Sequence, residues 1–186
     1  TYTVGICQLV QHNALDAATK GFEDALKDKL GDGVKIIEQN ASGDVATCIT
    51  IVNGFVSSNV DLIMANATPA LQAAQAATGD IPILGTSVTD YGTALGMEDF
   101  TGTTGVNISG TSDLAPLDQQ ANMIMELFPS AKKVGMLYCS AEANSVYQVN
   151  IIKAALESHG IKCQDFAFSD SNDVSAVTAN ACSWSD

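Results

Sequence analysis

The sequence predicts an α/β fold of doubly wound parallel sheets, and three observations support this prediction. Short apolar, strand-like segments alternate with helix-like segments along the chain. Residues 60–90 contain a complete strand–helix–strand unit with polar strand ends. The order of elements in the first half recurs about 130 residues further on, which indicates an internal structural repeat, with chance similarity between two α/β units as the alternative.

The unit at residues 60–90 is the centre of the predicted fold. Residues 62–65 predict a buried strand, and Thr68 is expected to be the N-cap of the helix that follows. Pro69 suits the first helical position, because an N–H there would have no intrahelical partner. Residues 70–77 are strong helix formers, and residues 81–84 predict a second buried strand.

The other elements of the first half precede this unit. An apolar stripe with helical spacing predicts a helix from Ala14, capped by Asn13 and ended by the glycines at 31 and 33. We further expect strands at residues 3–9 and 34–38, and a helix at 45–56.

Five glycines between residues 91 and 116 predict a long loop, a strand near 104–108 and a linker. We therefore expect two domains, an α/β ligand-binding lobe at residues 1–115 and a partial second α/β lobe at 116–186. In the second lobe we expect helices at 115–128, 146–158 and 174–181 and strands at 133–139 and 161–168.

The repeat predicts that the second lobe is incomplete. Its second helix leads to residues 183–186, where the counterpart of the core strand near residue 62 is expected to begin. We therefore expect the sequence to be the front part of a longer protein, with a naturally complete chain as the alternative. The start at Thr1, with no initiator Met or leader, indicates a processed or trimmed chain.

Composition excludes several partner classes. Eight basic residues against 21 acidic ones give a net charge of −13, so nucleic acid and anionic membrane surfaces are not expected partners. A hydrophobic content of 46% supports a real core, and no apolar run approaches the ~20 residues of a membrane span.

The five cysteines are odd in number and form no CxxC pair. We interpret all of them as small buried hydrophobes, with a disulfide framework or a metal site as the alternative. On this evidence alone they favour a reducing compartment. They are Cys7, Cys48, Cys139, Cys163 and Cys182.

The strand ends of the 60–90 unit predict a site for a small anion such as a carboxylate. A helix N-terminus carries unpaired N–H groups, and ligands of doubly wound sheets bind at the carboxyl ends of the strands. Ordinary helix capping is the alternative for Thr68 and Pro69. The expected anion-binding residues are Thr68, Pro69, Ala70, Ser87 and Thr89.

Further ligand contacts are expected around this centre. Asp90 is the candidate partner for an ammonium group, with turn capping as the alternative. Tyr91 or Tyr138 is a candidate for stacking on an aromatic ligand, with plain packing as the alternative. The other candidates, each with a structural alternative such as capping, hydrogen bonding or a solvated acid, are Gln8 and His12 from the first lobe and Glu142, Asn144 and Ser145 from the second.

Motifs of catalysis are missing from the sequence. There is no GxGxxG after the first strand and no GxxxxGK[ST], HExxH or GxSxG. We expect a protein that is not an enzyme and holds no cofactor or metal. A flavodoxin-like or isomerase-type enzyme remains an alternative.

Several segments resemble one family, the tryptophan- and tyrosine-binding proteins of ATP-binding-cassette importers. The resemblance spans essentially the whole chain, although Tyr91 stands where the family usually has proline. The matching segments are residues 4–18 (VGICQLVQHNALDAA), 39–44 (QNASGD), 67–70 (ATPA), 81–90 (IPILGTSVTD) and 138–145 (YCSAEANS).

The resemblance implies type I periplasmic-binding-protein lobes that close on a small amino acid of the aromatic class, tryptophan, tyrosine or phenylalanine. It implies delivery to a membrane permease and its ATPase subunit, and an extracytoplasmic location, periplasmic or lipid-anchored at the cell membrane. Pairing with another chain that completes the open sheet is a further expectation. A ligand-sensing effector domain of a regulator with the same fold is the alternative.

Overall fold

The computed structural model describes all residues from 1 to 186. The chain divides into two units, Thr1–Leu114 and Ala115–Asp186. The sequence placed this boundary after residue 115.

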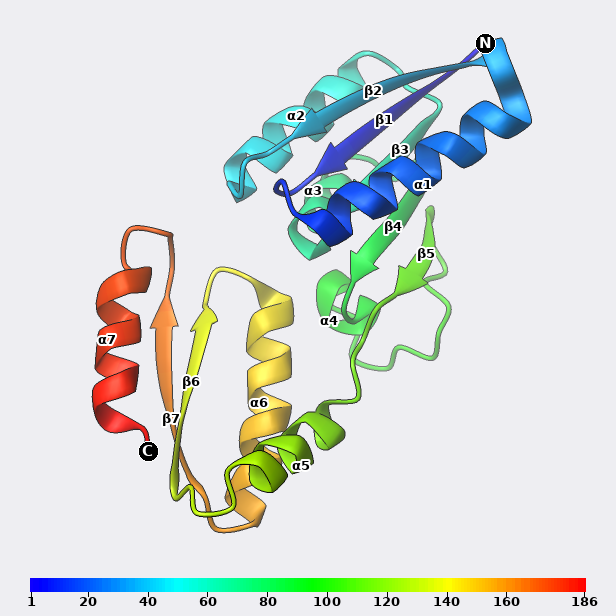
Figure 1. Cartoon of the computed structure of the whole chain (residues 1–186). Helices are drawn as coiled ribbons and strands as arrows, with labels where there is room; N and C mark the ends of the chain where they lie inside the picture. The colour runs from blue at the N-terminus through cyan, green and yellow to red at the C-terminus, as the bar shows by residue number, and fades with distance from the viewer. The chain divides into compact units, whose positions relative to one another are not determined.

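Unit 1 is built on a five-stranded, all-parallel sheet with the strand order β2-β1-β3-β4-β5 (Figure 1). This order is that of a doubly wound sheet. Its elements are β1 (Tyr2–Gln8), α1 (Asn13–Leu30), the 3₁₀ turn η1 (Gly31–Gly33), β2 (Val34–Asn40), α2 (Val45–Ser57), β3 (Leu62–Asn66), α3 (Thr68–Ala77), β4 (Ile83–Val88), α4 (Tyr91–Leu95) and β5 (Ile108–Ser112).

Helices cover both faces of this sheet, α1 on one side and α2 and α3 on the other (Figure 1). Alternation along β1 sends Val4 and Ile6 to the α1 side, where they join one apolar cluster, and Cys7 to the main core on the other side. Gly5 is required in β1, because an added Cβ would lie 2.6 Å from the Phe55 ring of α2.

Unit 2 contains a two-stranded parallel sheet, β6 paired with β7. Its helices α5 and α6 share an apolar cluster with this sheet, and α7 lies on the other face, where Trp184 packs against Phe166 (Figure 1). The elements are α5 (Leu117–Leu127), β6 (Lys133–Cys139), α6 (Ala143–Ser158), β7 (Lys162–Phe168) and α7 (Val174–Trp184).

An aspartate fixes the start of the first strand in both units. Asp61 donates its N–H to Thr3 O at 2.8 Å and accepts the Thr3 N–H on Oδ2 at 2.7 Å. Asp186 donates its N–H to Lys133 O at 3.2 Å and accepts the Lys133 N–H on Oδ2 at 3.0 Å. Two backbone amides that donate to this carboxylate, Lys132 N–H at 2.7 Å and Lys133 N–H, lower the pKa of Asp186. The predicted internal repeat is therefore present in hydrogen bonding as well as in element order.

Several predicted boundaries were wrong. Residues 91–95 form α4 rather than loop, because Asp90 caps a helical turn there, and β5 lies four residues later than expected. β4 begins at Ile83, and α6 begins at Ala143 rather than at 146. The cap of α1 is His12 rather than Asn13, since His12 Nδ1 accepts the Ala14 N–H at 3.2 Å.

The cysteines were only partly predicted. Cys7 and Cys48 are fully buried, as expected, and hydrogen bonding with the Cys48 thiol, together with burial, raises the pKa of the Cys7 thiol. Cys139 and Cys163 are only half-buried, and Cys182 is exposed, because the two-stranded sheet of unit 2 covers its strands and helices less completely. None of the helices has the length and apolar character needed to span a membrane.

Candidate functional site

The candidate site lies in unit 1, where the chain order of the sheet reverses. The connection after β1 runs outward to β2, whereas β3 pairs on the other side of β1. In open α/β sheets, ligands bind at the carboxyl ends of strands beside such a switch point. Gln8 and Asn66 are register partners at the ends of β1 and β3, so they mark this place. We refer to residues 66–70 and 87–90 as the rim.

A buried relay of side chains joins these two strand ends. Asn66 Nδ2 donates to Thr19 Oγ1 at 2.9 Å, and the Thr19 hydroxyl donates to Gln8 Oε1 at 2.6 Å. Gln8 Nε2 in turn donates to Asp16 Oδ1 at 2.6 Å. The relay fixes the orientation of both amides, because each nitrogen faces an acceptor. Gln8 therefore lies at the expected place, but its polar atoms are engaged within unit 1.

The β3–α3 junction departs from the expected capping. The N-cap of α3 is Ala67, with φ 96° and ψ 158°, and no side chain caps the helix. The prediction that Thr68 is the N-cap was wrong, because the left-handed turn at Ala67 moves the helix start one residue earlier. The first helical hydrogen bond runs from Leu71 N–H to Ala67 O at 3.0 Å, so the N–H of Ala70 has no intrahelical acceptor.

Two buried polar atoms at this junction have no hydrogen-bond partner, Thr68 Oγ1 and Asn66 Oδ1. Thr68 is 2% exposed and Asn66 is fully buried. An unpaired buried polar atom costs about 1–3 kcal/mol, so such atoms are rare and call for an explanation. A bound ligand with complementary polar groups would remove the cost. Sequence reasoning missed Asn66, although a polar residue that ends an apolar strand directly before a helix was a usable signal.

The end of β4 brings Ser87, Thr89 and Asp90 to the same edge of the sheet. Ser87 has a positive φ of 54°, which turns the backbone at the strand end. Thr89 is buried. Asp90 Oδ1 accepts the Thr93 N–H at 2.7 Å, so one carboxylate oxygen caps α4, as the turn-capping alternative anticipated. The β3–α3 junction is joined to this segment through the Ala67 N–H, which donates to Thr86 O at 3.0 Å.

The second-lobe candidates all lie at the start of α6 within unit 2. Glu142 is its N-cap residue, and Ser145 Oγ donates to Glu142 Oε2 at 3.3 Å. Asn144 Oδ1 is the third buried atom without a partner. Of the two candidate stacking residues, Tyr138 packs against the apolar cluster of unit 2, and Tyr91 is stacked on Phe100 inside unit 1.

The doubly wound sheet of unit 1, with polar strand ends beside its switch point, has the architecture of ligand-binding α/β lobes. The chain belongs to the family of ABC transporter substrate binding proteins, whose model matches residues 3–186. This membership confirms the predicted family and the type I periplasmic-binding-protein fold. Members of this family are substrate-binding proteins.

Two solved structures and one curated relative are similar to this chain. The tyrosine-binding protein of Clostridioides difficile (strain R20291) is 42% identical over 180 residues, which are 95% of this chain and 52% of the relative. The ABC domain from Streptococcus pneumoniae in complex with L-Trp has 34% identity and a TM-score of 0.92 over 100% of this chain and 63% of its own. A conserved domain protein from Vibrio cholerae has 36% identity and a TM-score of 0.89 over 97% of this chain and 62% of its own. The chain thus spans about half the length of the curated relative.

Proposed function

We propose that the chain captures an aromatic amino acid, tryptophan, tyrosine or phenylalanine, and binds its polar head at the rim of unit 1. The observation that carries this proposal is Thr68, whose hydroxyl is buried without a partner at the start of α3. A ligand carboxylate supplies the missing acceptor, and the N–H of Ala70 adds a second donor. The ligands named for the relatives from C. difficile and S. pneumoniae support the aromatic class.

The remaining ligand contacts follow from the same chemistry. The hydroxyls of Ser87 and Thr89 supplement the carboxylate site, and Asp90 balances the ammonium charge with the oxygen that does not cap α4. Gln8 and Pro69 hold the strand and helix ends in place, and His12 does so at the start of α1. From unit 2 we propose Glu142, Asn144 and Ser145 as further ligand contacts. The unpartnered Asn144 Oδ1 supports this last assignment.

The protein binds its ligand without transforming it. Ligand contacts stabilise a closed arrangement of the two lobes, which a membrane permease and its ATPase subunit recognise. A binding protein of an importer works outside the cytoplasm, so we place this one there, as a periplasmic or lipid-anchored protein. Family membership supports these partners and this location.

Thermal unfolding of the chain in the presence of each of the twenty amino acids tests the proposal. A ligand at about 100 times its dissociation constant stabilises the folded state by about 2.7 kcal/mol, which shifts the melting temperature by several degrees. We expect this shift with tryptophan, tyrosine or phenylalanine and none with aspartate or lysine. A shift with acidic or basic amino acids alone would contradict the aromatic assignment.

A further inference from the structure

We propose that Tyr91 is a positioning residue for ligand binding, because its hydroxyl holds the strand-end loop (residues 87–90) in its binding conformation. The inference rests on the proposed function, since Ser87, Thr89 and Asp90 of this loop are the proposed ligand contacts. Tyr91 directly follows the loop as the first residue of α4. Its side chain is 7% exposed and stacks on Phe100, so it acts on the ligand through the loop rather than by contact.

The loop begins at an irregularity in the sheet. Gly85 pairs with Gly110 and Val88 pairs with Ser112, so two residues of β4, Thr86 and Ser87, face the single residue Thr111 of β5. A bulge of this kind interrupts the regular hydrogen bonding between strands and bends the bulged strand. Ser87 lies in the bulge and has the positive φ of 54°. The direction in which the loop leaves the sheet therefore depends on what fixes the bulge.

The Tyr91 hydroxyl reaches the strand opposite this bulge. It donates a hydrogen bond to Thr111 O at 3.2 Å. The bond links Tyr91, which follows the loop, to Thr111, the β5 residue that faces the bulge. Residues 87–90 are therefore enclosed between the bulge and this hydrogen bond. Burial raises the pKa of Tyr91 to about 12, with a further contribution from the charge of Asp113, so the hydroxyl stays protonated and keeps its donor.

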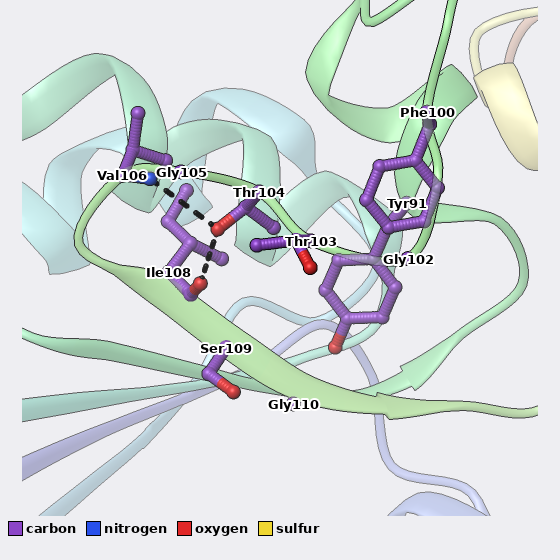
Figure 2. Close-up of a pocket in the computed structure, with 10 residues that line it drawn as sticks. All are labelled: Tyr91, Phe100, Gly102, Thr103, Thr104, Gly105, Val106, Ile108, Ser109 and Gly110. Carbon is purple, nitrogen blue, oxygen red and sulfur yellow. Dashed lines mark hydrogen bonds between the residues drawn. The ribbon is translucent and has the colours of Figure 1, made fainter.

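β4 and β5 leave room for the phenol group of Tyr91. A Cβ added to Gly85 would lie 2.4 Å from the Tyr91 hydroxyl oxygen, and one added to Gly110 would lie 2.1 Å from it. Both glycines thus accommodate the phenol. Figure 2 shows the Tyr91 ring below Phe100, with its hydroxyl directed toward Gly110. Both aromatic residues line a cavity of about 420 Å³. The conformation after Asp90 is thus fixed by Tyr91, whose ring stacks on Phe100 and whose hydroxyl fits over the paired Gly85 and Gly110.

Binding of L-tryptophan by calorimetry tests this role with Tyr91→Phe, which keeps the ring and removes the hydroxyl. We expect about five-fold weaker binding, the worth of one neutral hydrogen bond. Tyr2→Phe, which changes an exposed tyrosine of the same unit, is the matched control and leaves the affinity unchanged. In a Ser87→Ala background the Tyr91→Phe penalty shrinks, because the two changes act on the same contact. Equal penalties in both backgrounds, or none in either, would overturn the proposal.

Amide hydrogen exchange of the ligand-free chain separates this inference from the proposed function. Removal of the Tyr91 hydroxyl is expected to speed exchange in residues 86–90 and to leave β1 and β3 unchanged. If L-tryptophan does not bind to the unmodified chain, the proposed function fails, but the exchange result still shows whether the Tyr91 hydroxyl holds the strand-end loop. Unchanged exchange in residues 86–90 would show that the hydroxyl does not hold this loop.

Discussion

The Thr19 hydroxyl donates a 2.6 Å hydrogen bond to Gln8 Oε1, and this bond ties α1 to the end of β1. Thr19 also accepts from Asn66 Nδ2, so one hydroxyl connects both strand ends at the switch point. All three side chains are buried. These bonds hold the rim residue Asn66 through its amide nitrogen, while its Oδ1 and the nearby Thr68 Oγ1 have no partner.

Replacement of Thr19 by valine is expected to lower the free energy of unfolding by about 1–3 kcal/mol. The change keeps the side-chain shape but leaves the buried Gln8 Oε1 without a donor, and Asn66 Nδ2 retains only its bond to Leu15 O. Urea unfolding measures the loss. Thr50→Val is the matched control, because the Thr50 hydroxyl is exposed and bonds only to Ala46 O in its own helix. A loss in the Thr19 variant no larger than in the control would show that the relay contributes nothing.

Two substitutions of Asp90 separate its capping role from its charge. Asp90→Ala removes the cap of α4 and is expected to cost about 1 kcal/mol in unfolding, whereas Asp90→Asn retains a capping oxygen and costs a few tenths. Both remove the carboxylate, so both are expected to weaken binding of L-tryptophan by about ten-fold, as for a charged hydrogen bond. Calorimetry and urea unfolding give the two quantities. Normal affinity in Asp90→Asn would exclude Asp90 as the ammonium partner.

Stability is expected to fall in alkaline solution because of Tyr91. Its folded-state pKa of about 12 lies above the ordinary value of 10.0, so the folded protein resists ionisation that the unfolded chain undergoes. The contribution is complete below pH 10 and is lost as the pH rises through 12, by roughly 2–3 kcal/mol in total. Denaturant unfolding at pH 9 and pH 11.5 is expected to show about two thirds of this loss. The fall is expected to be smaller in Tyr91→Phe, and an equal fall in both proteins would contradict the assignment.

Glycine at position 5 is expected to be essential for packing. In Gly5→Ala the new methyl group would meet the Phe55 ring at 2.6 Å, so the core must shift at a cost of about 1–3 kcal/mol. Gly21→Ala is the matched control: the position lies inside α1 and a Cβ there meets nothing within 4 Å. The control is expected to raise stability by about 0.4–1 kcal/mol. Thermal unfolding of both variants checks the opposite signs.

The sequence predicted the parts of the fold that local patterns control. β6 has the predicted bounds, and the polar ends of β3 and β4 do meet at one edge, where Asn66 and Thr86 are register partners. β3 could be recognised because a parallel strand with both faces buried gives a continuous apolar run. α4 was missed because Gly92 and Gly96 resemble loop residues, and only the capping bond of Asp90 shows that a helix forms. A capping aspartate can also bind a ligand if its second carboxylate oxygen is available, and no sequence pattern reveals whether it is.

The place of Thr68 in the fold was predictable, but its local geometry was not. Thr68 lies at the start of α3 as expected, yet its hydroxyl was expected to cap the helix, and the positive φ of Ala67 could not be read from an alanine. The importance of Asn66 depends on Thr19, 47 residues earlier in the chain, which occupies its amide nitrogen and leaves Oδ1 unpaired. Long-range pairing of this kind requires the folded structure.

The central claim, that the polar head of an amino acid binds at the β3–α3 junction, is tested most directly with Thr68→Val. The change keeps the shape of the side chain and removes the buried hydroxyl that has no partner in the protein. Calorimetry with L-tryptophan is expected to show at least about ten-fold weaker binding, while the melting temperature stays the same or rises, because an unsatisfied polar group is lost. Unchanged affinity combined with lower stability would show that the hydroxyl serves the fold and not the ligand.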